Sequence, residues 1–252
     1  MQKPIYITFA SPKGGVGKTT LTTLMASYLH YTKEYNVAVI DCCYPEYGLD
    51  FLRRNEIEKI TKDNYYNRKA QKQFTAKNKK AYPVINTRVE TAIEEAEKLQ
   101  GADIILFDMP NIMSGKAVSL FAEMECIVFP LMGGTMYINT LQSFVEAINQ
   151  LVITTGKGKI KAMYLLRNRV NNWDGIEFTT ACEALAADTG TTLLNSTLSY
   201  SCHYQKDIFC SKKQDICVST LFPFDKQLPC IEQLRGFMQE MEQIVGKLCG
   251  KY

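Results

Sequence analysis

Short apolar runs alternate with segments of helical period along most of the chain. The runs have the length of buried strands, and the segments between them place apolar residues three or four positions apart. Strands are expected at Ile5–Ala10, Val37–Cys43, Ala102–Met109, Cys126–Leu131, Ile160–Val170 and Leu193–Leu198, with a short one at Pro83–Ile85. Helices are expected at Thr19–Tyr31, Arg88–Leu99, Gly115–Met124, Thr140–Ile153, Ile176–Asp188 and Ile231–Leu248. This alternation predicts an α/β fold with a mainly parallel sheet covered on both faces.

The pattern continues without a clear boundary between domains. No internal repeat, low-complexity tract or linker rich in Pro, Gly or Ser interrupts it, so residues 1–252 are expected to form one domain. No run approaches the roughly 18 apolar residues that span a bilayer, and the N-terminus begins with a strand instead of a charged-then-apolar leader. The sequence therefore predicts a cytoplasmic protein without membrane association.

One stretch differs from the rest in charge. Residues 53–80 hold 10 Lys/Arg and 3 Asp/Glu, a net charge of +7, whereas the whole chain has a net charge of only +3. Tyr65, Tyr66 and Phe74 are interleaved with these charges, a combination that can serve phosphate contacts and base stacking. Charge pattern alone slightly favours a solvated helical excursion at the rim of the sheet. A nucleic-acid site and a partner-protein surface remain the alternatives.

The nine cysteines indicate a reduced, intracellular protein. They are odd in number and show no C-x-x-C or Cys/His spacing typical of zinc sites. Adjacent residues of a strand point to opposite faces, so Cys42 and Cys43 are not expected to form a disulfide.

The most specific motif is a glycine-rich loop, Ser11-Pro-Lys-Gly-Gly-Val-Gly-Lys-Thr-Thr20, between the first strand and the first helix. Its glycines allow close approach of backbone N–H groups to phosphates, and the following helix directs its positive end at the anion. Lys18 is expected to contact the terminal phosphates and Thr19 to bind Mg2+. The residues expected to contact nucleotide are Gly14, Gly15, Val16, Gly17, Lys18, Thr19 and Thr20.

The run K-G-G-V-G-K-T-T resembles the deviant Walker A loop of the ParA/MinD family of ATPases, since Pro12 replaces the usual first glycine and Lys13 follows. The resemblance implies a P-loop NTPase fold of the SIMIBI type, with ATP and Mg2+ as cofactors. It also implies that Lys13 reaches the nucleotide of a second subunit in an ATP-bound homodimer. A glycine cluster can serve tight packing alone, but eight consecutive matching residues between a strand and a helix favour the phosphate loop.

A second strand ends at Asp41-Cys-Cys-Tyr-Pro-Glu46, which resembles the family motif Asp-x-Asp followed by Pro-Gln. The resemblance places Asp41 in the outer shell of Mg2+, and Cys43 stands where the family has the carboxylate that positions the attacking water. A neutral thiol does not accept a proton from water as a carboxylate does, so hydrolysis is expected to be slow. A nearby cation can lower a thiol pKa, which leaves a thiolate open. Glu46 and Asp50 are carboxylates that can substitute if they reach the site.

Two further motifs follow in the family's order. Asp103-Ile-Ile-Leu-Phe-Asp-Met-Pro110 resembles the Walker B strand, which gives Asp108 a role on Mg2+ through water and makes residues 111–115 a switch loop. In Leu165-Leu-Arg-Asn-Arg-Val170, Asn168 resembles the residue that contacts adenine, and satisfaction of local backbone groups is an equal alternative. The segment 223–229 is expected to form the other wall of the base site.

The final helix invites comparison with the membrane anchor of MinD proteins. Its apolar residues have helical spacing, but its polar face carries Glu232, Glu240 and Glu242 where a membrane-surface helix prefers Lys and Arg. Packing against the sheet is therefore expected.

Two functions remain open. The segment around Tyr35-Asn-Val-Ala-Val-Ile-Asp-Cys-Cys-Tyr-Pro resembles the ParA-like TraA proteins of Bacteroides-type conjugative elements, whose second motif reads Asp-Cys-Asp-Tyr-Pro-Gln. This implies a DNA-partition, positioning or conjugative-transfer ATPase in which Lys13, Lys18 and Asp41 act in catalysis, with DNA or a protein of a mobile element or partition system as partner. The alternative is a hydrolysis-deficient switch that holds ATP and binds a partner.

Overall fold

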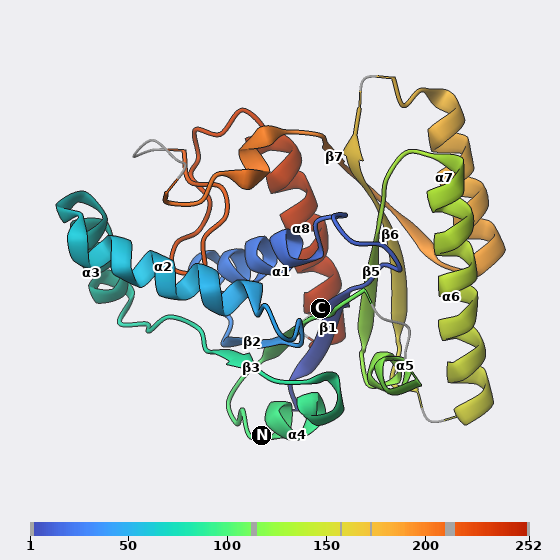
Figure 1. Ribbon diagram of the computed structural model, residues 1–252, viewed down its shortest axis with the longest axis horizontal. Coiled ribbons are helices and arrows are strands. Elements are labelled where there is room, and N and C mark those ends of the chain that lie inside the picture. Colours follow the sequence, from blue (N-terminus) through green and yellow to red (C-terminus); the bar gives the residue numbers. More distant parts are fainter. Residues whose placement is uncertain (1–2, 112–114, 157, 172, 210–214, 251–252) are drawn as a thin grey trace.

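The computed structural model describes residues 3–111, 115–156, 158–171, 173–209 and 215–250. One seven-stranded sheet with the order β3-β2-β4-β1-β5-β6-β7 forms its centre, and every paired strand is parallel (Figure 1). The strands are β1 (Ile5–Phe9), β2 (Val37–Asp41), β3 (Val84–Asn86), β4 (Ile104–Asp108), β5 (Cys126–Leu131), β6 (Ala162–Val170) and β7 (Thr192–Ser199). The predicted parallel α/β fold is confirmed.

The helices are also close to their predicted places. They are α1 (Lys18–Ser27), α2 (Gly48–Lys62), α3 (Asn64–Lys77), α4 (Ala92–Glu97), α5 (Gly115–Ala122), α6 (Thr135–Thr155), α7 (Ile176–Thr189) and α8 (Ile231–Leu248). A π-helical turn (Tyr28–Thr32) continues α1, and 3-10 turns lie at Val89–Thr91 and Cys202–Gln205. Several bounds differ from the sequence prediction: α6 begins five residues earlier, α1 ends at Ser27 where the π-helical turn takes over, α4 begins at Ala92 after a 3-10 turn, and β2 ends at Asp41.

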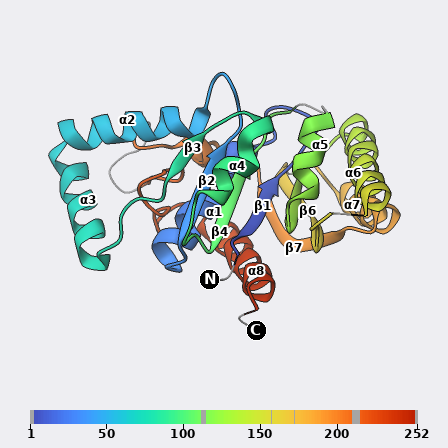
Figure 2. The same cartoon turned by 90° about the horizontal axis from the view of Figure 1, so that it is seen from below.

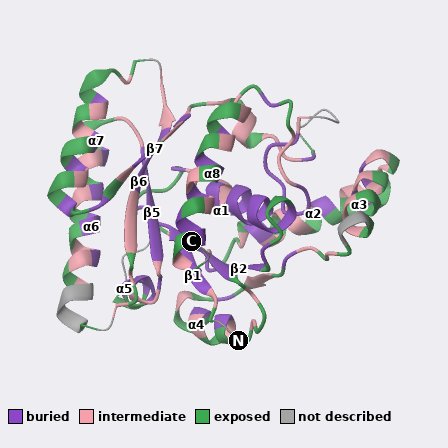
Figure 3. Cartoon of the chain, turned by 180° about the vertical axis from the view of Figure 1, so that it is seen from behind, coloured by how far each residue is buried: buried purple, intermediate pink, exposed green. Residues whose placement is uncertain are grey.

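The strands distribute their side chains between two apolar layers. Along β1, Ile5, Ile7 and Phe9 belong to the layer beneath α1 and α8, whereas Tyr6 belongs to the layer beneath α5, α6 and α7. The other central strands alternate in the same way, because successive side chains of a strand point to opposite faces. Figure 3 shows the central strands β1, β2 and β5 as buried and α6 and α7 with exposed outer faces. Burial on both faces explains why the strands are continuously apolar in sequence.

The C-terminal helix α8 packs against the sheet, as predicted. Leu234, Phe237, Met238 and Met241 are fully buried in the layer that contains β1 and α1. Its acidic face contributes too, since the Glu240 carboxylate accepts backbone N–H bonds from the β7 residues Asn195 and Ser196. The apolar face of this helix is therefore part of the core.

The basic stretch forms two helices, α2 and α3, which extend to the end of the molecule opposite α6 and α7 (Figures 1 and 2). The prediction of a helical excursion is confirmed. A small separate cluster joins α3 to the segment before α8, through Tyr66, Ala70, Ile208, Ile216 and Phe222. Lys69 forms an ion pair with Asp225 at 2.9 Å in the same contact. Part of the basic charge thus serves to fix the excursion to the body of the protein.

Within the described residues, no helix combines the length and the apolar character needed to cross a membrane.

Candidate functional site

The predicted motifs meet at the carboxyl ends of the central strands. In the register of the sheet, Asp108 at the end of β4 lies beside Phe9 of β1 on one side and Asp41 of β2 on the other. The loops that follow these three strands therefore emerge together, which is where parallel sheets bind ligands. A cavity of about 600 Å³ opens at this edge. Its wall comes from the glycine-rich loop and α1, the loops after β2 and β4, the end of β6 and the segment after β7.

The glycine-rich loop has a backbone that requires glycine. Gly15 and Gly17 have φ angles of 73° and 94°, a left-handed region that side chains disfavour. A Cβ atom on Gly14 would lie 2.8 Å from the amide nitrogen of Asn111. Val16 is buried in the core and holds the loop down. No side chain caps the N-terminus of α1, so its first N–H groups face the cavity mouth as anion donors.

Lys18 lies inside this loop and is buried. Its Nζ donates to the side-chain oxygen of Asn111 and to the backbone oxygen of Lys13 at 3.4 Å. Burial lowers the pKa of Lys18, and the nearby Asp108 and Cys43 oppose that effect. Asn111 begins the predicted switch loop; residues 112–114 of that loop lie outside the described residues. The lysine predicted to bind phosphate and the first residue of the predicted switch loop are therefore in contact.

Lys13 lies outside the cavity on an exposed part of the loop. Its Nζ is 5.5 Å from the centroid of the Tyr137 ring in α6, a cation–π contact. The Tyr137 hydroxyl donates to the backbone oxygen of Pro130 at 2.6 Å and lies 3.0 Å from Ser11 Oγ. Tyr137 therefore connects the loop to β5 and α6, a role that the sequence did not indicate.

Three oxygen-bearing side chains converge behind Lys18. Thr19 Oγ1 donates to Asp108 Oδ2 at 2.7 Å, and the Asp41 carboxylate accepts backbone N–H bonds from Cys43 and Leu49 at 3.0 Å each. Both aspartates have no exposed surface. Burial, together with the Asp41 charge, raises the pKa of Asp108 to about 7. Burial also raises the pKa of Asp41.

This arrangement fits a divalent cation. Asp108 Oδ1 is buried without a hydrogen-bond partner among the described atoms, and such an atom ordinarily has one. Carboxylate and hydroxyl oxygens are the hard ligands that Mg2+ prefers, usually with waters and phosphate oxygens completing its shell. Thr19, Asp41 and Asp108 are therefore suited to hold Mg2+ beside the phosphates.

Cys43 lies against the same carboxylate. Its Sγ is 3.6 Å from Asp108 Oδ2 and 3.7 Å from the Asp108 backbone oxygen. Burial raises the pKa of Cys43 far above its ordinary value, and the charges of Asp108 and Asp41 raise it further. The thiolate that the sequence left open is therefore disfavoured, because burial and the two neighbouring carboxylates both favour the neutral thiol.

The two carboxylates proposed as substitutes are placed differently. Glu46 lines the cavity. Asp50 lies on the first turn of α2 and forms an ion pair with Arg54 at 2.9 Å. Of the two, only Glu46 lies in the cavity wall.

Asn168 contacts the loop itself. Its side-chain nitrogen donates to the backbone oxygen of Val16 at 2.8 Å, and the residue is 5% exposed. The neighbouring Arg169 has a φ of 56° and donates to the backbone oxygen of Gly15. Both residues at the end of β6 therefore support the glycine-rich loop, whether or not Asn168 also contacts a base. Arg169 was missed, although the adjacent Asn-Arg pair was the available signal.

The far wall of the cavity differs from the prediction. Tyr200, Ser201, Tyr204 and Gln205, which follow β7, form it. The segment 223–229 does not contribute to this wall; its Phe224 stacks on Tyr28 with ring centroids 6.0 Å apart. No sequence motif indicated this wall, because the residues after β7 come to the cavity only through the order of the strands in the sheet.

Comparisons with known proteins agree with this geometry. Residues 7–207 match the family described as the CobQ/CobB/MinD/ParA nucleotide binding domain. No curated protein sequence matches at a significant level.

Solved structures give the same result for the fold. A variant of McdA from Cyanothece in complex with ATP has a TM-score of 0.63 at 16% identity, and the alignment covers 97% of each chain. A putative plasmid partition protein from Borrelia burgdorferi bound to AMPPNP has a TM-score of 0.58 at 15% identity, over 96% of this chain and 100% of that one. The septum site-determining protein MinD from Pyrococcus horikoshii with Mg-ADP has a TM-score of 0.56 at 15% identity, over 96% and 98%. At these identities the likeness shows a shared fold.

Proposed function

The chain belongs to the CobQ/CobB/MinD/ParA nucleotide-binding family, and from this premise we propose that it binds Mg-ATP, dimerises around the nucleotide and hydrolyses it slowly. Its output is the partition, positioning or conjugative transfer of DNA. The observation that carries the proposal is a cavity at the carboxyl edge of the sheet that Lys18 and Thr19 line, with Asp41 and Asp108 buried next to each other behind it and Asp108 bonded to Thr19. A volume of about 600 Å³ is in the range of small-molecule sites.

The phosphates are expected to bind at the N-terminus of α1. There the uncapped N–H groups and the Lys18 ammonium offer a concentrated positive field for an anion. When bound, Mg2+ neutralises phosphate charge and orients a water at Asp41 and Asp108. Lys18 must leave Asn111 to contact the phosphates, so nucleotide binding frees the start of the switch loop.

The sugar and base are expected to occupy the opposite half of the cavity. Asn168 lies beside the loop, and Tyr200 and Tyr204 form the far wall. Aromatic rings offer a stacking surface for a base, and the Asn168 side-chain oxygen is available as an acceptor.

Slow hydrolysis follows from the neutral thiol of Cys43. An attacking water needs a group that accepts its proton or fixes its orientation, and a protonated thiol beside Asp108 does this poorly. Glu46, which also lines the cavity, is the carboxylate available to act in its place.

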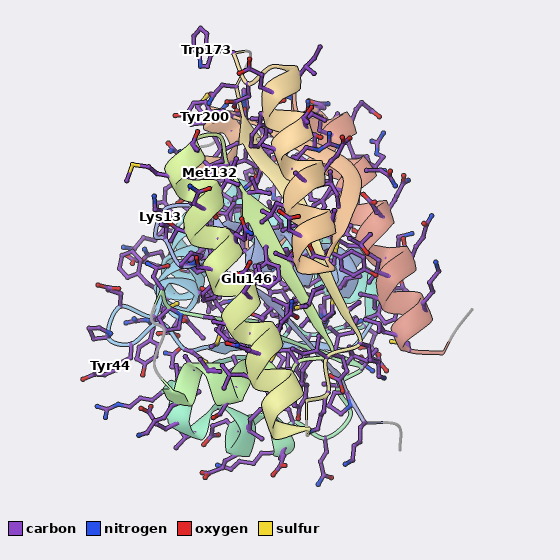
Figure 4. All side chains as sticks on the ribbon, turned by 90° about the vertical axis from the view of Figure 1, so that its right-hand side faces the viewer. Lys13, Tyr44, Met132, Glu146, Trp173 and Tyr200 are labelled. Atoms are coloured by element: carbon purple, nitrogen blue, oxygen red, sulfur yellow. The ribbon has the colours of Figure 1, made fainter. Side chains whose placement is uncertain are left out.

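Dimerisation is supported by the face that carries Lys13. Figure 4 places Lys13, Met132, Tyr200 and Trp173 along one edge of the molecule, on the side where the cavity opens. Trp173 is 88% and Tyr200 54% exposed on this edge, and large apolar side chains gathered on one face are typical of an interaction surface. We propose that a second copy covers this face and that Lys13 leaves Tyr137 to reach the partner's phosphates.

A single-turnover assay with radiolabelled ATP tests the function. We expect phosphate release that is slow in the natural protein, absent in Lys18→Ala and Lys13→Ala, and accelerated in Cys43→Asp. Cys43→Ser is the matched control, because it changes the same position without adding a carboxylate. Absence of Mg-dependent ATP binding in the natural protein, measured by calorimetry, would contradict the proposal.

The second candidate is a switch that retains ATP without hydrolysing it. It is favoured by the close contact between the Cys43 thiol and Asp108. In this contact the thiol takes up a carboxylate oxygen that is proposed to face Mg2+. A stable dimer that still contains intact ATP after hours, and that gains turnover only in Cys43→Asp, would establish this candidate over the first.

A further inference from the structure

A cysteine and two aspartates form a compact buried group at the ends of β2 and β4. One ligand atom each from Asp41, Cys43 and Asp108 lies within 4.8 Å of the other two. Both aspartates are completely buried, and Cys43 is half-buried. The oxygen beside the Cys43 thiol is Asp108 Oδ2, which also accepts from Thr19 Oγ1, whereas the other oxygen of the same carboxylate, Oδ1, is buried without a hydrogen-bond partner among the described atoms. Two buried carboxylates beside a thiol, one of them with an unpartnered oxygen, form a donor set that a cation would complete.

The spacing of these atoms corresponds to one tetrahedral ion. A zinc ion has bonds of about 2.3 Å to sulfur and about 2.1 Å to a carboxylate oxygen, so two such ligands on a tetrahedral ion lie about 3.6 Å apart. The distance from Cys43 Sγ to Asp108 Oδ2 is 3.6 Å. The Asp41 carboxylate is fixed by the backbone N–H groups of Cys43 and Leu49, and the Asp108 carboxylate is fixed by the Thr19 hydroxyl, so two of the three ligands are held in place before an ion arrives.

The sulfur changes which metal the group prefers. A site of oxygens alone suits Mg2+, Ca2+ and Mn2+, whereas a thiolate ligand selects borderline and soft ions. We propose that Asp41, Cys43 and Asp108 form a binding site for a thiophilic divalent cation of the Zn2+ class, which the chain binds without nucleotide. The three protein ligands leave a fourth position open for water or for a phosphate oxygen.

Binding at this site replaces a proton by the metal. The Cys43 S–H bond breaks, its proton passes to buffer, and the sulfur lone pair forms the bond to the ion. The ion replaces the thiol contact with Asp108 Oδ2. It also occupies the space in front of the Mg2+ carboxylates, so Zn2+ and Mg-ATP are expected to compete or to share a phosphate oxygen.

Cobalt titration of the purified, nucleotide-free protein tests the site. Co2+ is the probe because its thiolate complexes absorb in the near ultraviolet. We expect one Co2+ per chain, with a thiolate-to-metal band that Zn2+ removes and a large excess of Mg2+ does not. Cys43→Ser should lose this band and bind Co2+ more than about tenfold more weakly. Cys202→Ser, at an exposed cysteine, is the matched control and should behave as the natural protein.

Two further measurements keep the test decisive if Cys43→Ser folds poorly. Cys43→Asp should bind Co2+ without the thiolate band and should now bind Mg2+ in competition with it. In the natural protein, Zn2+ binding should release the Cys43 proton to the buffer, measured as metal-dependent proton release in calorimetry across buffers of different ionisation enthalpy, and Cys43→Asp should show no such thiol proton. A band that persists in Cys43→Ser, or Zn2+ binding to the natural protein without proton release, would overturn the proposal. ATP binding does not enter these readouts, so they succeed or fail independently of the proposed function.

Discussion

Asn168 illustrates how a single side chain can support two interpretations from sequence and a sharper one from structure. Its side-chain nitrogen bonds to the backbone oxygen of Val16 in the glycine-rich loop. The amide therefore supports the loop directly. Neither role considered from the sequence, contact with adenine or hydrogen bonding to backbone groups at the strand end, included this one. Its side-chain oxygen is still available to a base.

Asn168→Ala is expected to weaken nucleotide binding by about fivefold, the effect of one lost hydrogen bond of about 1 kcal/mol. Comparison of ATP with tripolyphosphate separates the two roles. If Asn168 acts through the loop, affinity for both ligands falls in calorimetry, because both depend on the loop backbone. If it acts on the base alone, tripolyphosphate affinity is unchanged. Asn195→Ala, at an exposed asparagine of β7, is the control and should bind both ligands normally.

At this scale the sequence predicted what is local and missed what is not. Gly14 to Thr20 form one continuous motif between a strand and a helix, so their positions followed from the pattern. Three residues from distant parts of the chain also reach the site: Tyr137 from α6, Arg169 from β6 and Tyr200 from the segment after β7. Their contacts depend on the order of the strands in the sheet, which no local motif indicates. The direction of the pKa shift of Cys43 could not be predicted from the sequence either, because it depends on burial beside two carboxylates.

At the scale of elements, the contact between α2 and the segment before α8 depends on a buried acid. Glu56 of α2 is completely buried, and its Oε2 accepts from the backbone N–H and the hydroxyl of Thr220. Its Oε1 has no partner among the described atoms. Arg53, one turn earlier, donates to Thr220 Oγ1 at 2.6 Å and to the backbone oxygen of Tyr82 at 3.0 Å. Burial raises the pKa of Glu56 to about 7 from its ordinary 4.5.

This shift makes the free energy of unfolding depend on pH. The folded protein retains the Glu56 proton to a higher pH than the unfolded chain does. The contribution of Glu56 to the free energy of unfolding therefore falls as pH rises from about 4.5 to about 7, and it is constant above pH 7. The shift corresponds to about 3 kcal/mol. Glu56→Gln cannot ionise and should lose this part of the slope in urea unfolding measured between about pH 5 and pH 8. Equal slopes for the two proteins would contradict the role, since other titrating groups such as Asp108 contribute to both.

The elements themselves were predictable to the extent that their periodicity was strong. The apolar strands and α8 were found because burial on one or both faces leaves a clear pattern. The start of α6 was missed because its first turn carries exposed residues such as Met136. Met136 is apolar but not buried, so it does not contribute to the periodic pattern of core-facing residues. The basic excursion was expected to be helical, but its division at Asp63, which caps α3 by accepting from the N–H of Tyr65, was not recognised.

For the whole molecule, the uneven charge bears on DNA binding. Within the basic excursion, Lys69 pairs with Asp225, Lys62 with Glu58, and the Lys79 ammonium donates to the backbone oxygen of Tyr35. Arg68 and Lys72 are exposed on α3 and are the better candidates for phosphate contacts. The excursion is thus partly an internal support and partly a basic surface.

Arg68→Glu combined with Lys72→Glu is expected to lower nonspecific DNA affinity and to flatten its dependence on salt, since each lost phosphate contact reduces the slope by about 0.9. Fluorescence anisotropy with labelled duplex DNA over a range of salt concentrations measures both quantities. A double change to Glu of Lys98, directly after α4, and of Lys116 in α5, both away from the excursion, is the charge-matched control. If both variants lose affinity equally, the contact is general electrostatics and the excursion is not the DNA site.

Also at this scale, the proposed dimer makes the exposed apolar residues beside α7 a test of where a second copy binds. Trp173 and Ile176 are 88% and 86% exposed at the start of α7, and burial of one such side chain in an interface contributes about 1.5–3 kcal/mol. Trp173→Ser and Ile176→Ser are each expected to weaken an ATP-dependent dimer by at least about tenfold, as measured by sedimentation velocity with Mg-ATP.

Ile57→Ser is the matched control, because Ile57 is half exposed on α2, away from this face. ATP affinity of the monomer should stay unchanged in all three variants, because none of these residues lines the cavity. A dimer that is equally stable in the α7 variants and in Ile57→Ser would place the subunit contact on another face and would leave Lys13 without the partner it is proposed to reach.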